Sequence, residues 1–136
     1  MSFAMSGPLQ KAVYDALRAD TSLGLIVGGA VYDAVPKGAL PQIYVLLGTE
    51  TVTDASDGSG NGAVHRFTVS VVTTTPGFAQ AKAAAGAVSD ALQDADLTLS
   101  RGKLVTLRFD RARAVQINGA STRQIDLRFN ARVQDD

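Results

Sequence analysis

The stretch HRFTVSVVTTT, residues 65–75, decides the fold class. Apolar side chains at positions 67, 69 and 71 alternate with polar side chains at 66, 68 and 70, and this period of two predicts a half-buried β-strand. Upstream, residues 43–47 (IYVLL) are apolar at every position, which predicts a central strand covered on each side. The segment TDASDGSGNGAVH, residues 53–65, joins the two strands.

Two amphipathic helices flank this pair of strands. Residues 8–19 place apolar side chains at 9, 12, 13, 16 and 17, with Pro8 at the first helical position and Ser6 or Gly7 as the cap. A second helix is expected to begin at Thr75–Pro76, and its apolar stripe runs through 78, 81, 85, 88 and 92. Between the first helix and the strands, Asp20 is expected to cap a short turn that Gly28 ends.

Further strands are predicted on both sides of the second helix. A short edge strand covers 30–35, and three segments follow at 104–109, 112–117 and 124–133, the last two separated by an Asn118–Gly119 turn. In 124–133 the odd-numbered positions from 125 face inward. Hairpin succession with helices on one face predicts an α+β fold. We expect one domain over residues 1–136, with a mostly antiparallel or mixed sheet and two main helices packed on it.

Composition narrows the functional classes. The chain has no cysteine, so disulfides and thiolate chemistry are excluded. No apolar run approaches the ~18 residues that a membrane span needs, and the first residues lack the features of a signal peptide. We therefore expect synthesis in the cytoplasm and no membrane partner.

Charge is balanced overall but unevenly placed. The formal net charge is zero, with 13 basic and 13 acidic residues. Eight of the basic residues and four of the acidic residues follow position 100, so that segment carries +4 and the first hundred residues carry −4. The asymmetry indicates either a solvated basic sheet face or complementary surfaces between copies of the chain.

The glycine-rich segment 53–65 admits three interpretations. A phosphate-binding loop is not supported, because no Gly-Lys-Ser/Thr is present and the sequence predicts that a strand, not a helix, follows. A calcium loop needs alternating oxygen ligands and a closing glutamate; Asp54, Asp57 and Asn61 do not fit that spacing. Weak Mg²⁺ or Ca²⁺ binding stays open, but Gly, Ser, Asn and Asp are typical of a long hairpin loop.

The sequence gives little support to an enzyme. His65, the only histidine, could act as a general base, yet no nucleophile or metalloprotease motif accompanies it, and Glu50 is the only glutamate. We expect His65 to be a surface or hydrogen-bonding residue. The late arginines lack interleaved aromatic residues, so a single-strand nucleic-acid platform is not expected. No catalytic residue, metal site or cofactor is predicted.

Several blocks of the chain resemble the tail terminator, or tail completion, proteins of long-tailed phages and gene transfer agents. The resemblance spans nearly the whole length. Its first blocks are residues 28–36 (GGAVYDAVP) with Leu40–Pro41, residues 43–48 (IYVLLG) and residues 65–71 (HRFTVSV). They are followed by Gly77–Phe78, Ala81–Lys82, Ala87–Val88 and Ala91–Leu92, and by residues 104–109 (LVTLRF) with Ala112.

The resemblance implies a structural virion protein at the tail–neck junction. Such a protein forms a ring, usually of six copies, on the last ring of the tail tube, stops tube polymerisation and faces the neck proteins. Its implied partners are further copies of itself, the tail tube protein, the head completion or neck protein, and DNA that passes through the pore in transient, non-specific contact.

Two groups of residues are candidates for these contacts. A loop that contacts the neighbouring ring, weakly ordered in the free subunit, comprises Asp54, Asp57, Gly58, Gly60, Asn61 and Gly62. Subunit-interface or pore candidates are Arg108, Arg128 and Arg132. The alternative is a small ligand-binding or regulatory α+β oligomer, which would need a closed apolar pocket with a few convergent polar groups.

Overall fold

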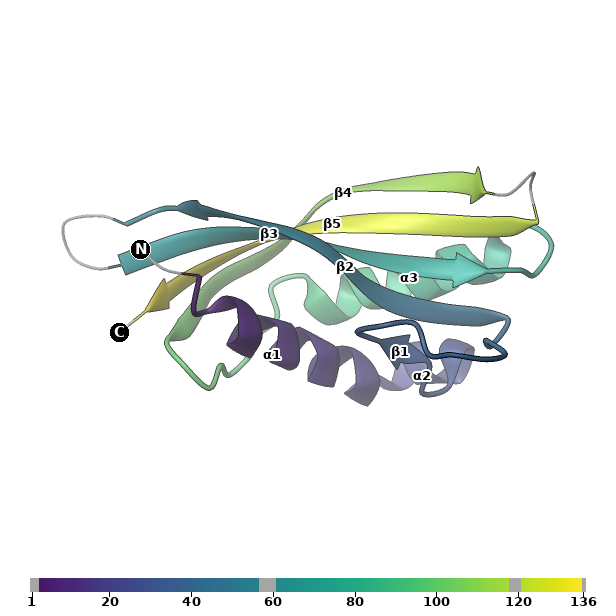
Figure 1. The fold of residues 1–136 in the computed structure, drawn as a ribbon, viewed down its shortest axis with the longest axis horizontal. Coiled ribbons are helices and arrows are strands. Elements are labelled where there is room, and N and C mark those ends of the chain that lie inside the picture. The colour runs from purple at the N-terminus through teal and green to yellow at the C-terminus, as the bar shows by residue number, and fades with distance from the viewer. Residues whose placement is uncertain (1–2, 57–60, 118–120, 136) are drawn as a thin grey trace.

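A computed structural model describes residues 3–56, 61–117 and 121–135. Its elements are α1 (Ser6–Ala19), α2 (Thr21–Val27), β1 (Val31–Tyr32), β2 (Ile43–Asp54), β3 (Asn61–Thr73), α3 (Ala79–Leu92), β4 (Lys103–Ile117) and β5 (Thr122–Asp135). The strands form a five-stranded sheet in the order β1-β2-β3-β5-β4 (Figure 1). The α+β prediction is confirmed.

The sheet is mixed, and two long hairpins dominate it. Strand β1 pairs in parallel with β2, whereas β2–β3, β3–β5 and β4–β5 are antiparallel. The β3–β5 ladder runs from Asn61 opposite Asp135 to Thr73 opposite Arg123. As a result β3 and β5 form the middle of the sheet, and β1 and β4 form its two edges.

The helices cover one face of the sheet, below it in the view of Figure 1. Helix α1 buries one side chain per turn, at Leu9, Val13 and Leu17, as the apolar stripe predicts. Helix α3 buries mainly alanines, whose small side chains allow the helix to lie close to the strands.

The predicted inward residues of β5 lie in this core. All five odd-numbered side chains from Ile125 to Val133 are buried. Phe129 is completely buried, with ring centroids 5.7 Å from Phe67 and 5.9 Å from Phe109.

Two helix starts differ from the prediction. Helix α1 begins at Ser6 after Met5, with no side-chain cap, and the Ser6 hydroxyl donates instead to Glu50. Helix α3 begins at Ala79 rather than at Thr75–Pro76, because Gly77 has a φ of 76°, which a right-handed helix cannot accommodate. The cap on α2 is as predicted: Asp20 accepts a hydrogen bond of 2.9 Å from the Leu23 N–H, and Gly28 ends the helix.

The strand boundaries also differ from those predicted from the sequence. Strand β1 has two residues instead of six, and β2 extends to Asp54 instead of ending at residue 47. The prediction that β2 is covered on both faces is wrong, because Tyr44 and Leu46 point away from the helices and are only half-buried. The segments 104–109 and 112–117 are one strand, β4, with a bulge between them. The predicted turn residues Asn118 and Gly119 lie outside the described residues.

Candidate functional site

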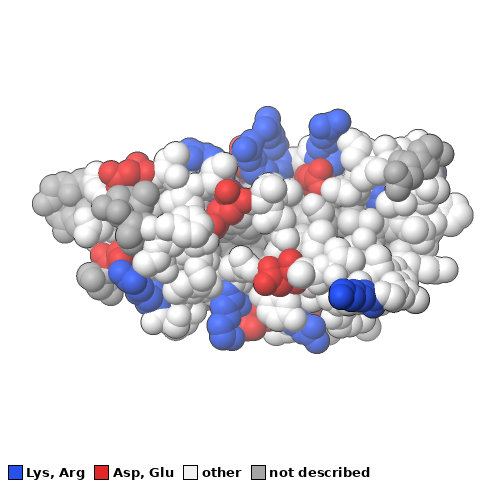
Figure 2. Space-filling view, in the orientation of Figure 1, with Lys and Arg blue, Asp and Glu red and all other residues white. Residues whose placement is uncertain are grey.

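The sheet face opposite the helices is basic along β4 and β5. Four cross-strand pairs lie on this face: Thr106–Arg132, Arg108–Asn130, Arg111–Arg128 and Arg113–Asp126. They alternate with the buried residues of β5, so their side chains point away from the core. Five of these eight residues are arginine and one is aspartate. Figure 2 shows Lys and Arg side chains projecting along the upper edge of the molecule.

A β-bulge places two arginines directly opposite each other. Arg108 pairs with Asn130 and Phe109 with Phe129, but the next pair is Arg111–Arg128, because the bulge skips Asp110. A regular ladder would set Asp110 against Arg128, an attractive pair. Like charges directly opposite each other destabilise a sheet, by about 0.2–1 kcal/mol. The bulge therefore keeps two positive side chains, Arg111 and Arg128, next to each other.

A hollow of ≈ 440 Å³ lies at this pair, lined by Thr68, Arg111, Ala112, Arg113, Asp126 and Arg128. Asp126 is already engaged, since its Oδ1 accepts hydrogen bonds from Ser70 Oγ (2.6 Å) and Gln124 Nε2 (2.7 Å). The guanidinium groups of Arg111, Arg113 and Arg128 form no hydrogen bond or ion pair within the described part of the chain. The hollow is suited to an anion.

The arginines selected from the sequence lie on this face but have different surroundings. Arg108 approaches Asp94 at 3.8 Å, with both side chains 68% exposed, a geometry that contributes little. Arg132 donates to the Ala55 carbonyl at 3.3 Å, and Arg128 lines the hollow. Sequence reasoning missed Arg111 and Arg113. In a regular strand the odd-numbered Arg111 and Arg113 would lie on the opposite face from the even-numbered Arg108. Arginine at these positions was therefore the one sign in the sequence of a bulge between them.

The described part of the glycine-rich loop is the end of the β2–β3 hairpin. Asp54 pairs with Ala63, and the Ala55 N–H donates to the Gly62 carbonyl at 2.9 Å. Hydrogen bonds from the Ser56 hydroxyl (2.6 Å) and backbone N–H lower the pKa of Asp54. The other loop candidates, Asp57, Gly58 and Gly60, lie outside the described residues. A strand follows the loop, as the argument against a phosphate cradle requires.

The general-base candidate is buried in a polar network. His65 is 0% exposed, and its Nδ1 lies 3.0 Å from Glu50 Oε2, while Ser6 bonds the other carboxylate oxygen. Burial acts to raise the pKa of Glu50, but the hydrogen bonds from His65 and Ser6 outweigh it and hold that pKa below its usual value. A substrate has no access to this imidazole. The network ties the start of α1 to the sheet. Of the two expectations for His65, the hydrogen-bonding role is confirmed and the surface location is wrong.

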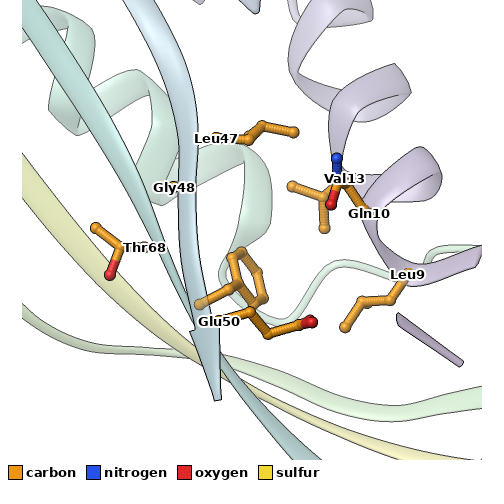
Figure 3. A pocket seen from close by; sticks show the side chains of 8 residues that line it. Leu9, Gln10, Val13, Leu47, Gly48, Glu50 and Thr68 are labelled. Carbon is orange, nitrogen blue, oxygen red and sulfur yellow. The ribbon is translucent and has the colours of Figure 1, made fainter. Parts of the chain in front are cut away.

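The apolar pocket beside this network is too small for a metabolite. Leu9 and Val13 of α1 face Leu47 and Glu50 of β2 across a cavity of ≈ 30 Å³ (Figure 3). Phe67 also lines this cavity. Typical ligand sites measure about 300–1,000 Å³. This pocket has room for about one water molecule and gives no support to a ligand-binding role.

Among residues 3–56, 61–117 and 121–135, no three His, Asp or Glu side chains gather as a group that could hold a metal ion. None of the described helices combines the length and hydropathy that a membrane span requires.

Comparison with known proteins identifies the family. The model of the family described as "Tail completion protein gp17" matches residues 11–134. The chain belongs to this family. The resemblance inferred from the sequence blocks is thereby confirmed.

A solved structure similar to this tail completion protein is a chain from the virion of a native gene transfer agent (GTA) particle. The two sequences are 60% identical, the TM-score is 0.94, and the match covers 98% of this chain and 99% of that chain. A search of curated proteins gave no significant match.

Proposed function

We propose that this chain, as one domain over residues 1–136, is a structural protein of a phage-like or gene-transfer-agent particle. It caps the tail tube as a ring, stops tube polymerisation and joins the tail to the head. The observation that carries the proposal is the 60% identical chain from a gene transfer agent virion, matched over nearly the full length of both chains. Family membership supports a structural tail role.

Ring formation has a physical basis in the charge distribution. A closed ring needs two different patches on each subunit that fit each other. One sheet face is rich in arginine, whereas Asp90 of α3 is exposed on the helix layer and the first hundred residues carry a net charge of −4. Opposite charge on two parts of one chain supports heterologous contacts between copies. We propose six copies, on the resemblance to terminator rings.

Termination requires a subunit that binds a tube end without recreating it. The end of a growing tube is the same interface that each added ring uses, so growth stops only when a different surface covers it. We assign the tube contact to the hairpin end that carries Asp54, Asn61 and Gly62, together with the loop positions Asp57, Gly58 and Gly60. A glycine-rich tip can adapt to a ring of different shape.

Removal of the gene tests the role directly. Particles lacking this protein are expected to show DNA-filled capsids and tails of abnormal length, or tails that do not join, in electron micrographs. Normal tailed particles would end the terminator assignment. Electron microscopy and native mass measurement of the ring test the copy number, and a single copy or a twofold dimer in particles would contradict it.

Charge reversal tests the contact residues. Arg108→Glu, Arg128→Glu and Arg132→Glu are each expected to weaken ring formation or head–tail joining without unfolding the subunit, because all three side chains lie off the core. Lys37→Glu, an exposed position before β2, is the matched control. If all three reversals left assembly and gene transfer intact, the charge-complementarity part of the proposal would have to be given up.

A further inference from the structure

We infer that the hollow formed by Arg111, Arg113 and Arg128 binds the phosphodiester backbone of double-stranded DNA. The inference rests on the proposed place of the chain at the end of a tail through which DNA leaves the particle. It narrows that proposal: Arg128 belongs to the DNA-facing group, and Arg108 and Arg132 are left for contacts between subunits.

Arg111 and Arg128 form a repulsive cross-strand pair. The bulge between Phe109 and Arg111 removes Asp110 from the position opposite Arg128 and substitutes a second guanidinium. Bulges commonly re-aim side chains at functional positions. An anion placed between Arg111 and Arg128 converts their repulsion into two attractive contacts. Planar guanidinium groups suit phosphate oxygens because they donate two parallel hydrogen bonds.

The outward residues around the hollow are polar or charged at every cross-strand pair. From Thr106 to Arg113 on β4, and from Asp126 to Arg132 on β5, the outward residues in the four cross-strand pairs include no apolar side chain. The core of a protein–protein interface is depleted in charged residues and enriched in aromatic ones. Protein–DNA interfaces are more polar and much more positive. The part of this face around Arg111, Arg113 and Arg128 therefore fits DNA better than the acidic surface of another subunit.

The placement of the arginines determines whether the hollow can distinguish DNA sequences. The guanidinium groups are distributed over two adjacent strands and surround a hollow that is open to solvent, so they can follow a backbone but cannot enter a groove as a helix does. Phosphate contacts position nucleic acid without reading its bases. The site is therefore expected to bind duplexes of different sequence equally.

The test is the binding of a short fluorescent DNA duplex to the purified full chain, measured by anisotropy at several salt concentrations. Each phosphate contact contributes about 0.9 to the slope of log K against log salt. The double variant Arg111→Ala/Arg113→Ala is thus expected to lower that slope by about 1.8 and to weaken binding roughly sixtyfold at about 0.1 M salt. Circular dichroism verifies that the variant is folded.

Three further variants make the result specific. Lys11→Ala/Lys37→Ala removes the same charge from exposed positions on α1 and in the segment before β2, and is expected to change affinity less than about threefold, because distant exposed charges are screened. Arg111→Lys/Arg113→Lys keeps the charge and should retain most of the binding. Asp126→Asn removes the carboxylate from the hollow but keeps an oxygen for Ser70 and Gln124, so it should bind more tightly than wild type.

Distinct outcomes separate this inference from the proposed function. No binding by wild type at low salt, or equal losses in the alanine double variant and the lysine control, would overturn the DNA site and leave the terminator role standing. A change in the oligomer mass of Arg111→Ala/Arg113→Ala with unchanged DNA affinity would assign the hollow to a neighbouring subunit. Abnormal tails in the gene deletion concern only the proposed function.

Discussion

Replacement of Glu50 is the most informative perturbation of the fold, because one carboxylate holds two elements together. Its Oε2 lies 3.0 Å from Nδ1 of His65, and its Oε1 accepts from Ser6 at the start of α1. Glu50→Ala removes both contacts. The His65 ring is 0% exposed.

The magnitude follows from these two lost bonds. A buried donor left unsatisfied costs about 1–3 kcal/mol, and an ordinary hydrogen bond contributes about 1 kcal/mol. We therefore expect Glu50→Ala to lower the free energy of unfolding by about 2–4 kcal/mol at neutral pH. Ser6→Ala, which removes one partner only, should cost about 1 kcal/mol. Glu50→Gln keeps one acceptor oxygen and should fall between the two.

The pH dependence gives a second readout. The folded-state pKa of Glu50 lies below its usual value, so the ionised carboxylate stabilises the fold above the unfolded-state pKa of about 4.3, and this contribution is lost as the pH falls through the folded-state pKa. The stability difference between wild type and Glu50→Gln should therefore shrink as the pH falls below about 4.

Urea unfolding followed by far-UV circular dichroism measures both effects, and it suits a chain without tryptophan. Lys11→Gln, on the exposed side of α1, is the control for a surface change on the same helix. A cost below about 0.5 kcal/mol for Glu50→Ala, or a Glu50→Gln difference that does not vary with pH, would refute the structural role of the network.

Three further predictions concern the core, a turn and the arginine pair. Phe129→Ala is expected to cost about 3–5 kcal/mol in urea unfolding, because its ring is completely buried between Phe67 and Phe109; a cost below about 1.5 kcal/mol would contradict this packing. Gly102→Ala should destabilise by about 1–3 kcal/mol, since φ is 63° and a Cβ would lie 2.4 Å from the Gln134 carbonyl oxygen; an unchanged melting temperature would be inconsistent with that turn. Arg111→Gln should raise the free energy of unfolding by about 0.2–1 kcal/mol by removing the repulsion from Arg128, and a clear loss of stability would mean that the two guanidinium groups do not repel in the free subunit.

The parts of the fold that the sequence predicted correctly are those set by local periodicity. The alternation from Ile125 to Val133 and the stripe of α1 both correspond to buried faces. The extension of β2 through residues 48–54 was not predictable, because this polar segment is a strand only through its pairing with β3. The start of α3 depended on the backbone conformation of Gly77, which the favourable Thr75–Pro76 pattern concealed.

The candidate site was predictable in character but not in arrangement. A basic sheet face followed from the charge count, and the outward direction of Arg128 and Arg132 followed from alternation. The opposition of Arg111 to Arg128 depends on a bulge, which is set by pairing between strands and not by either strand alone. The assignments of the loop and of individual arginines to partners stay predictions.

The bulges in the edge strand β4 also affect how readily free subunits aggregate. An unpaired edge offers its backbone N–H and C=O groups to any strand that meets it, and this is a common start of fibrous aggregation. Strand β4 is a long edge of fifteen residues, but its register shifts at two places and its middle carries Arg108, Arg111 and Arg113. Kinks and cationic side chains both discourage such strand addition. A free subunit is therefore expected to resist aggregation through strand addition at β4.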